Sequence, residues 1–362
     1  MKVLYTTTAP APYKVDMFEY LGKLCDLTVV FECSKQGYRE DSWLRKEFTN
    51  FTAIFIQGFI FRDRLISRQI VDIIQNENFD RIIIGMYSTP SNMIAMEYMR
   101  RKKVPYILSS DGGFIKKDTK LAYIIKKRYI GAAEAWLSTG EATNEYLVHY
   151  GANTDNIYIY PFSSVKKSEI QEEDLSPNRI AEIRSELGVS EEKCVISVGQ
   201  FIYRKGFDVL INACEFVSGN VGIYIIGGTP TEEYNRIMEK KNLQNIHFVG
   251  FKSKEELRKY YQAADLFVLP TREDIWGLVI NEALANGLPV VTTEKCVAGL
   301  EMITEGVTGY IVPTNDSIAL AEAINKALLP NCLSRSRCRE KASSYTVEDM
   351  AERHYEILSR ME

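Results

Sequence analysis

Short apolar runs alternate with amphipathic segments along the whole chain. In the first half the runs predict strands, and several of them are continuously apolar instead of alternating with polar residues. Continuous apolar runs are typical of parallel strands that are buried on both faces. Between them, amphipathic segments such as 15–24 and 65–76 predict helices. The predicted strands of this half are 3–7, 27–31, 53–56, 81–85, 106–109, 135–138 and 157–160.

The same alternation restarts in the second half. Two successive βαβ arrays predict an α/β protein with two doubly wound, Rossmann-like domains that face each other across a cleft. A chain of 362 residues has room for two cores of this kind. The predicted strands of the second half are 194–198, 222–226, 246–250, 266–269, 289–293 and 310–312, and the predicted helices are 207–216, 231–240, 254–263, 278–286 and 317–327.

The boundary between the two arrays lies in a polar stretch. We expect a first domain over 1–165, a linker over 166–176 and a second domain over 177–345. Ser176 and Pro177 suit the N-cap and the first position of a helix. The last segment, 346–362, predicts one more helix that begins after Thr346.

Composition and charge exclude several classes of protein. Hydrophobic residues make up 46% and charged residues 25% of the chain, which excludes wholesale disorder and fibrous repeats. The net charge is −4, with +3 over 1–165 and −7 over 166–362, and this is too weak a basic balance for a nucleic-acid partner. No apolar run is long enough for a membrane span, and the N-terminus does not read as a signal peptide. The seven scattered cysteines indicate reduced thiols in a cytoplasmic protein.

Two acids near the end of the second array have a spacing that suits a sugar nucleotide. Asp274 falls in a loop after a strand, and Glu282 falls inside the following helix. Backbone N–H groups at the start of this helix, around Trp276 and Gly277, favour an anion. Two hydroxyl-binding acids with an anion site between them match the order of sugar, diphosphate and ribose. The alternative is that the two acids are unrelated and lie eight residues apart by chance, which explains the spacing equally well.

A second motif places two adjacent cations after a strand. Arg204 and Lys205 follow the strand 194–198 and precede Gly206 and a predicted helix. Cations at the carboxyl end of a parallel strand can neutralise a diphosphate, since arginine offers a planar fork and lysine a compact charge. A solvated basic turn is the alternative interpretation.

Six blocks of the second half resemble, in order and spacing, the donor domain of the glycosyltransferase family four enzymes, which have the GT-B fold. The first half resembles bacterial capsular, exopolysaccharide and lipopolysaccharide glycosyltransferases more loosely, in 9–15 and 109–114. The six blocks are Gly199 with Arg204-Lys205-Gly206, Gly227-Gly228, Phe248-Val249-Gly250-Phe251, 264–270, Asp274-x7-Glu282-Ala283 and 287–291.

The resemblance implies a retaining, metal-independent glycosyltransferase of the hexosyltransferase type, with no cofactor beyond its nucleotide-sugar co-substrate. Arg204 and Lys205 match the residues that bind the diphosphate, Asp274 the residue that contacts the transferred sugar, and Glu282 the residue that binds the ribose. The acceptor belongs to the first domain, to which the C-terminal helix returns. The further donor-binding residues implied are Gly199, Gly250, Phe251, Trp276, Gly277 and Leu278.

Three departures from the family's pattern affect the site. Position 274 is Asp where the family usually has Glu, so the carboxylate is one methylene shorter. Many members place a His after the fifth strand, where this chain has Asp111, which we expect either to contact the sugar or to cap a turn. The first loop lacks the family's glycines; Pro12 stiffens it, and Tyr13 is expected to cover the acceptor side.

One basic stretch, 114–130, carries six cations against a single acid and interleaves them with apolar residues. A basic amphipathic helix suits an anionic membrane surface, whereas a solvated helix face is the alternative. The six cations are Lys116, Lys117, Lys120, Lys126, Lys127 and Arg128.

We therefore expect a cytoplasmic enzyme, peripheral on the inner face of the cell membrane, that acts in bacterial surface polysaccharide biosynthesis. It would move a sugar from a nucleotide-sugar donor, a UDP-sugar, to a polyprenyl-linked or glycan acceptor. The alternatives are a GT-B transferase with a soluble small-molecule acceptor and a non-catalytic partner subunit that binds nucleotide sugars. The three histidines, at 149, 247 and 354, are not spaced as metal ligands, so no metal site is expected.

Overall fold

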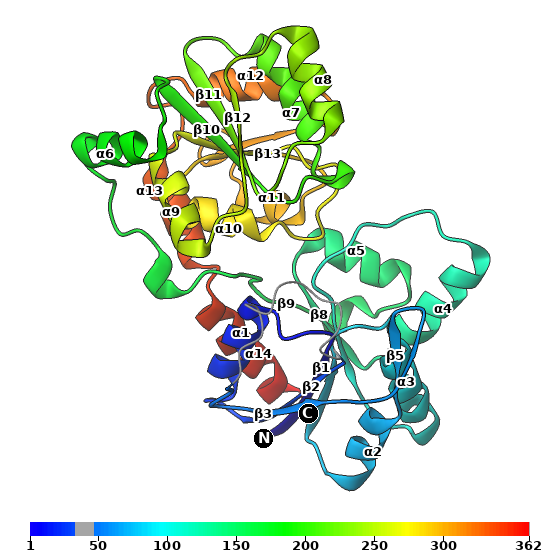
Figure 1. Ribbon diagram of the computed structural model, residues 1–362. Helices are drawn as coiled ribbons and strands as arrows, with labels where there is room; N and C mark the ends of the chain where they lie inside the picture. The colour runs from blue at the N-terminus through cyan, green and yellow to red at the C-terminus, as the bar shows by residue number, and fades with distance from the viewer. Residues whose placement is uncertain (33–46, 362) are drawn as a thin grey trace. The chain divides into compact units, whose positions relative to one another are not determined.

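The computed structural model describes residues 1–32 and 47–361. This part of the chain forms two compact units (Figure 1). The first unit consists of Met1–Ser164 and the C-terminal residues from Thr346 onward, and the second unit is Val165–Tyr345. The segment predicted as a linker, 166–176, is grouped with the second unit, where the Gln171 N–H donates to the Ala285 carbonyl at 2.9 Å.

The first unit is built on a parallel sheet that has seven strands within the described residues, in the order β3-β2-β1-β6-β7-β8-β9. The order reverses direction at β1, as in a doubly wound sheet. The inner strands are buried almost throughout, as their continuous apolar runs predict. The strands are β1 (Lys2–Thr7), β2 (Asp26–Phe31), β3 (Thr52–Phe55), β6 (Arg81–Ile84), β7 (Ile107–Ser109), β8 (Ala135–Ser138) and β9 (Ile157–Ile159).

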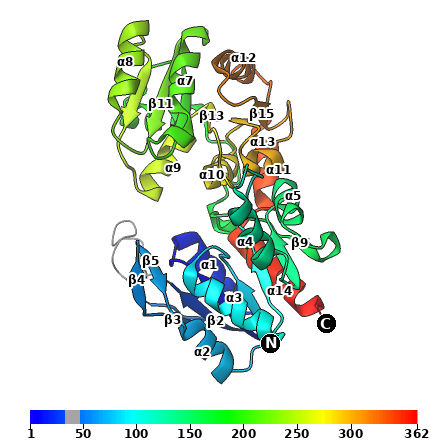
Figure 2. The same cartoon turned by 90° about the vertical axis from the view of Figure 1, so that its right-hand side faces the viewer.

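Helices cover this sheet (Figure 2). Pro12 occupies the first turn of the first helix, so this helix begins earlier than the predicted 15–24 and ends at Leu21. A fixed φ and a missing N–H suit proline to that position. The helices are α1 (Pro12–Leu21), α2 (Gln69–Asn76), α3 (Pro90–Lys102), α4 (Lys120–Ile130), α5 (Glu141–His149) and α14 (Val347–Arg360).

The sequence-based helix 65–76 is wrong in its first residues. Residues 64–66 form β5 (Arg64–Ile66), which pairs antiparallel with β4 (Phe59–Phe61) in a separate two-stranded hairpin. The helix itself begins only at Gln69. Apolar residues at 65 and 66 continue the spacing of the helix that follows, so periodicity alone could not separate the strand from it.

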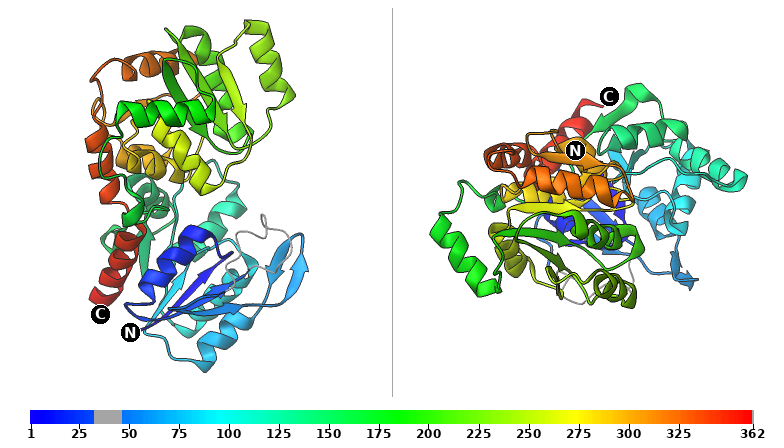
Figure 3. Two further views of the ribbon diagram at one scale, coloured as in Figure 1. Left: turned by 60° about the vertical axis from the view of Figure 1, so that its left-hand side comes forward. Right: turned by 90° about the horizontal axis from the view of Figure 1, so that it is seen from above.

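The C-terminal helix α14 belongs to the first unit although it follows the second unit in the sequence. It packs beside α1, as Figure 3 shows for the red and dark blue helices of the left panel. Met350 and Leu358 are buried, and Arg81 Nε donates to the Leu358 carbonyl at 3.2 Å. The expected return of the final helix to the first domain is confirmed.

The second unit contains another parallel sheet, with six strands in the described residues, in the order β12-β11-β10-β13-β14-β15. The predicted strands of this half are confirmed to within a residue or two at each end. The strands are β10 (Lys193–Val198), β11 (Val221–Ile226), β12 (Ile246–Val249), β13 (Leu266–Leu269), β14 (Val290–Thr293) and β15 (Gly309–Val312).

The helices of the second unit carry the caps that the sequence indicates. Ser176 Oγ accepts the Arg179 N–H at the start of α6, with Pro177 as its first residue. The predicted helix 207–216 ends at Ala213 and continues as a 3₁₀ turn to Phe216. The helices are α6 (Pro177–Leu187), α7 (Phe207–Ala213), α8 (Glu232–Lys241), α9 (Lys254–Ala263), α10 (Leu278–Ala285), α11 (Val297–Met302), α12 (Ser317–Ala327) and α13 (Arg335–Ser343).

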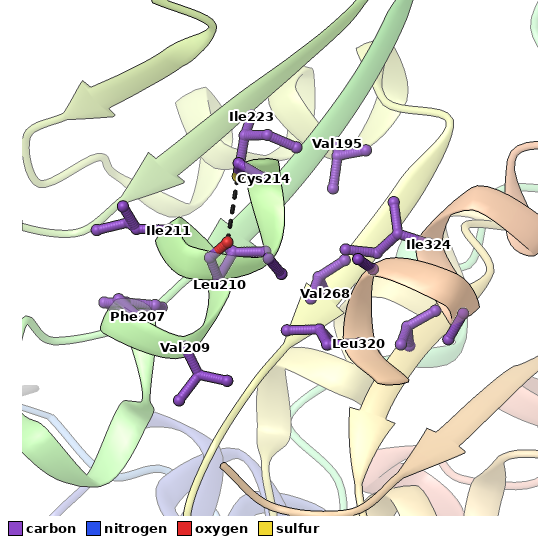
Figure 4. Packing of buried hydrophobic residues seen from close by; sticks show 14 of the residues in the cluster. Val195, Phe207, Val209, Leu210, Ile211, Cys214, Ile223, Val268, Leu320 and Ile324 are labelled. Carbon is purple, nitrogen blue, oxygen red and sulfur yellow. Dashed lines mark hydrogen bonds between the residues drawn. The ribbon is translucent and has the colours of Figure 1, made fainter. Parts of the chain in front are cut away.

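The core of the second unit lies between its sheet, α7 and α12 (Figure 4). Phe207 and Leu210 from α7 and Ile324 from α12 are fully buried against the central strands. Cys214 Sγ lies in this core and donates to the Leu210 carbonyl at 3.1 Å. Burial raises the pKa of the Cys214 thiol to about 12, so this thiol is a packing residue and not a nucleophile. The described cysteines are all free thiols, as expected.

Candidate functional site

Arg204 and Lys205 lie in a 3₁₀ turn just beyond the carboxyl end of β10. Gly206 ends this turn with φ +68°, and a Cβ there would lie 2.1 Å from the Pro270 carbonyl oxygen. Glycine is therefore required for the turn to approach the end of β13. The approach is fixed by the Arg272 N–H, which donates to the Arg204 carbonyl at 2.8 Å. The two cations are thus held at the edge where a doubly wound sheet binds its ligands.

Asp274 lies between these two cations. Its Oδ2 is 2.5 Å from Lys205 Nζ and its Oδ1 is 3.3 Å from Arg204 Nη1, while Arg204 Nη1 also donates to the Glu273 carbonyl at 2.7 Å. The side chains of Lys205 and Asp274 are 11% and 10% exposed, but that of Arg204 is 43% exposed. From the sequence, Arg204 and Lys205 are expected to bind the diphosphate and Asp274 the transferred sugar. The structure joins all three in one cluster with a net charge of +1.

Backbone hydrogen bonds hold the loop that carries Asp274 at both ends. The Asp274 N–H donates to the Lys295 carbonyl at 2.7 Å, and the Trp276 carbonyl accepts the Ala298 N–H at 2.8 Å. Trp276 is buried, and its Nε1 donates to Asn281 Oδ1 at 2.7 Å. These bonds place the start of α10 beside the Arg204–Lys205–Asp274 cluster, as the predicted anion site requires.

Gly277 is the N-cap of α10 and Leu278 is its first residue. The φ of Gly277 is +104°, and a Cβ on it would lie 2.7 Å from Cys296 Sγ. Both the backbone conformation and the packing therefore demand glycine at this position. A larger residue at position 277 would prevent the loop that carries Asp274 from entering α10 in this conformation.

Glu282 lies in α10, one turn beyond Leu278 as predicted. Its Oε2 accepts a hydrogen bond from the Tyr261 hydroxyl at 3.0 Å. Burial and the neighbouring Glu282 carboxylate raise the pKa of Tyr261 well above its usual value, so the tyrosine remains a donor. The hydroxyl fixes the orientation of the carboxylate.

The remaining predicted donor residues lie at the carboxyl edge of the same sheet. A Cβ on Gly199 would lie 3.3 Å from Lys205 Cε, so this glycine makes room for the lysine side chain. Gly250 and Phe251 follow the edge strand β12, two strands away from β10. The Phe251 side chain is 67% exposed.

Asp111 lies in the first unit, just after β7. Its Oδ2 is 2.6 Å from Lys14 Nζ, and its Oδ1 accepts from the Tyr160 hydroxyl at 3.5 Å. Burial is the largest single influence on Lys14 and lowers its pKa, but Asp111, Tyr13 and Tyr5 together raise the pKa by more, so this lysine is a cation. Asp111 is therefore the partner of a buried cation, a role that neither of the two expectations for this residue included.

The acceptor-side residues predicted in the first loop are close to this ion pair in the sequence. Pro12 and Tyr13 open α1, directly before Lys14. The Tyr13 ring makes an edge-to-face contact with Phe162, with centroids 5.5 Å apart. Lys14 was not identified from the sequence, although a lysine soon after the first strand indicates a cation at this sheet edge.

The cations of the basic stretch 114–130, which includes α4, do not all face solvent. Lys116, Lys117, Lys120 and Lys127 are exposed. Lys126, by contrast, turns toward Asp118 and the Tyr150 hydroxyl at 2.9 and 3.2 Å, and Arg128 forms an ion pair with Glu97 of α3 at 2.8 Å. Lys126 therefore does not belong to the exposed face of the helix.

Two features are absent from the described residues. Among them, no three His, Cys, Asp or Glu side chains are grouped so that they could hold a metal ion. In the same ranges, 1–32 and 47–361, no helix has the length and apolar character to span a membrane.

Comparison with known proteins adds independent information. Residues 179–345 match the family model "Glycosyl transferases group 1". The chain is 25% identical over 217 residues to the O-antigen chain mannosyltransferase C of Escherichia coli, an alignment that covers 58% of this chain and 55% of that protein. It is 29% identical over 225 residues to the D-inositol 3-phosphate glycosyltransferase of Corynebacterium aurimucosum, covering 58% and 52%. The alignments thus span about half the length of these relatives.

A solved structure is similar over the whole chain. The crystal structure of Anabaena Alr3699/HepE in complex with UDP superposes with a TM-score of 0.80 at 17% identity and covers 100% of both chains. At this identity the likeness concerns the fold, and it confirms the expected GT-B class with two Rossmann-like domains.

Proposed function

Because residues 179–345 form a glycosyltransferase domain of group 1, we propose that the chain transfers a sugar from a UDP-sugar to an acceptor in surface polysaccharide synthesis. The observation that carries this proposal is the Arg204–Lys205–Asp274 cluster beside the N-terminus of α10. Two cations and a helix N-terminus form a site for a diphosphate, and a carboxylate at the same point can accept hydrogen bonds from sugar hydroxyls. The UDP complex of the similar Anabaena protein supports the choice of nucleotide.

The proposed reaction is a retaining displacement that needs no metal. The bond between the anomeric carbon and the departing phosphate oxygen breaks, and the acceptor oxygen bonds to the same face of the anomeric carbon. The acceptor proton passes to the phosphate oxygen. Arg204, Lys205 and the start of α10 stabilise the negative charge that develops on the diphosphate, a task for which fixed charges serve well. No side-chain nucleophile is required.

Each remaining polar residue has a place in this proposal. Glu282, oriented by Tyr261, binds the ribose hydroxyls. In the absence of donor, Asp274 neutralises Lys205; with donor bound, its carboxylate turns to the transferred sugar. In the first unit, Asp111 and its partner Lys14 contact the acceptor or the distal part of the sugar.

The acceptor we propose is a lipid-linked or glycan acceptor, as the O-antigen mannosyltransferase named among the relatives suggests. The second candidate is a soluble acceptor, which the inositol phosphate glycosyltransferase among the relatives favours. A non-catalytic partner subunit is the third possibility that the test must separate.

The test is release of UDP from a UDP-sugar in the presence of EDTA, with a polyprenyl-diphosphate glycan or inositol phosphate as acceptor. Nuclear magnetic resonance of the product reports the anomeric configuration. Transfer to the lipid-linked glycan with retention supports the proposal, and transfer only to inositol phosphate supports the second candidate. Binding of UDP-sugar without transfer to any acceptor, or an inverted product, would overturn the proposed reaction.

A further inference from the structure

The β4–β5 hairpin presents three consecutive large apolar residues to solvent. Phe59, Ile60 and Phe61 are 68%, 50% and 54% exposed. Successive residues of a strand point to opposite faces, so Phe59 and Phe61 share one face of the hairpin. Ile60 lies on the other face, where its strand partner Leu65 packs against the core of the first unit. Figures 1 and 3 show the hairpin extending from the edge of the first unit. Three consecutive large apolar residues with at least half of each side chain exposed are costly in water and indicate a surface that is covered in use.

The base of the hairpin is held firmly, in contrast to its exposed tip. Ser91 of α3 is fully buried, donates to the Leu65 carbonyl at 2.9 Å and accepts the Ser67 N–H at 3.2 Å. Ser67 Oγ also donates to the Gln57 carbonyl across the base of the hairpin at 2.6 Å. A Cβ on Gly58 would lie 2.3 Å from the Ile66 carbonyl oxygen, so the strands are as close there as glycine allows.

The tip carries positive charge beside its aromatic rings. Arg62 and Asp63 make the turn, both with positive φ. The Arg62 guanidinium lies 5.4 Å from the centre of the Phe61 ring. Arg64 and Arg68 are also exposed, so residues 59–68 have three arginines against one acid. Arginine next to exposed aromatic rings suits the interface of an anionic membrane, where rings lie at the level of the head groups.

The same helix that holds the hairpin also holds α4. Glu97 of α3 forms an ion pair with Arg128 of α4 at 2.8 Å, six residues after Ser91, which holds the hairpin. Exposed apolar residues of α4 and the loop before it, Ile115, Leu121 and Ile124, are 48–69% exposed among Lys116, Lys117 and Lys120. The first unit thus has two apolar and basic projections fixed to one helix.

We propose that the β4–β5 hairpin inserts Phe59, Ile60 and Phe61 into the interface of an anionic lipid leaflet, with the cations of the hairpin and of α4 against the lipid phosphates. A second copy of the chain fits this surface less well, because two such tips would bring Arg62 and Arg64 against the same residues of the partner copy. The proposal concerns binding to a surface and goes beyond the proposed sugar transfer.

The experiment is cosedimentation of the full chain with phosphatidylcholine vesicles that either contain or lack phosphatidylglycerol. We expect binding only to the anionic vesicles. A triple variant, Phe59→Ser, Ile60→Ser and Phe61→Ser, should bind them at least about tenfold more weakly, because burying even one large apolar side chain is worth that factor. The matched control, Phe216→Ser, Ile318→Ser and Leu329→Ser, removes similarly exposed apolar residues from the second unit and should bind like the original protein.

A second variant keeps the test independent of any effect on folding. In Phe61→Trp, the added indole should show a blue-shifted emission with anionic vesicles and should be quenched by brominated lipids. Unchanged emission, equal binding by both triple variants, or no binding of the original chain to anionic vesicles would overturn the proposal. If the original chain is a dimer and the triple variant of the hairpin is a monomer, a second copy of the chain covers this surface. That result would also overturn the proposal. UDP release in vesicle-free buffer reports on the proposed function separately and should be unchanged in the hairpin variant.

Discussion

Lys205 and Asp274 form an almost fully buried ion pair, with Nζ and Oδ2 2.5 Å apart, although 69 residues separate them in the chain. The pair joins the turn after β10 to the loop before α10 and leaves Arg204 as the more exposed cation. A diphosphate that binds here has to compete with the carboxylate for Lys205. The pair therefore sets both the affinity for the nucleotide and the position of the acid.

Replacing Asp274 by Asn should separate binding from transfer. The change removes a negative charge beside Lys205 and raises the local charge from +1 to +2, so UDP should bind several-fold more tightly. The rate of sugar transfer should fall by about 10²-fold, the usual effect of losing one group that stabilises the transition state. Titration calorimetry and UDP release measure the two quantities. Weaker UDP binding by a folded Asp274→Asn protein would contradict the account.

Glu282→Ala should raise the KM for the UDP-sugar about tenfold or more, because a carboxylate that binds two ribose hydroxyls contributes hydrogen bonds to a charged group. Tyr261→Phe is the matched control, since it removes the hydroxyl 3.0 Å from Glu282 but keeps the carboxylate. Its KM should change much less. Steady-state kinetics with varied donor decides this, and equal KM values for Glu282→Ala and the original protein would refute the ribose assignment.

The ion pair of Lys14 and Asp111 should contribute to stability in a way that a double variant reveals. Lys14→Met leaves the Asp111 carboxylate, which is only 20% exposed, without its cation. We expect the free energy of unfolding to fall by about 2 kcal/mol, since breaking a buried pair from one side is costly. Adding Asp111→Asn should recover much of this loss. Urea unfolding measures both, and a double variant no more stable than Lys14→Met would contradict the pairing.

His354 should make the first unit less stable in mild acid. The net pKa of this histidine is lowered to about 4, chiefly by burial. The Met350 carbonyl, which is 2.7 Å from Nδ1, and the nearby Asp111 raise the pKa, and Lys14 lowers it. The rings packed against His354 are those of Tyr5 and Tyr160. Below its ordinary pKa of 6.5 the unfolded chain binds a proton that the folded chain excludes. Stability therefore falls as the pH drops from 6.5 to 4.

The loss over this range should approach about 3 kcal/mol relative to His354→Gln, because each pKa unit corresponds to about 1.4 kcal/mol. His149→Gln changes an exposed histidine and serves as the control. Unfolding free energies at several pH values give the comparison. The same pH dependence in the original protein and in His354→Gln would show that another group is responsible.

The sequence predicted the repeated βαβ order because buried parallel strands leave continuous apolar runs that need no knowledge of their partners. It also singled out Arg204, Lys205 and Asp274 in loops that follow strands, and Glu282 inside the helix after the last of these loops. It did not reveal that Asp274 pairs with Lys205, because strand order decides which loops meet, and β10 and β13 are neighbours only in the sheet. For the same reason, Lys14 was not connected with Asp111.

Local pattern misled the prediction in two places. At 65–66, residues of the β5 strand have the spacing of the helix that follows, and the hairpin was missed. On α4, a count of cations could not show that Lys126 turns toward Asp118, which precedes the helix. In both cases the outcome depends on tertiary contacts, with α3 for the hairpin and with Tyr150 for the lysine.

The most direct test of the central claim is the thermal stability of the chain with UDP in the presence of EDTA. If the Arg204–Lys205–Asp274 cluster binds the diphosphate, UDP should raise the melting temperature of the original protein, since a ligand that binds only the folded state stabilises it. Lys205→Ala should abolish the shift, while the exposed-lysine control Lys127→Ala should keep it. An equal shift in Lys205→Ala, or none in the original protein, would show that the nucleotide does not bind at this cluster.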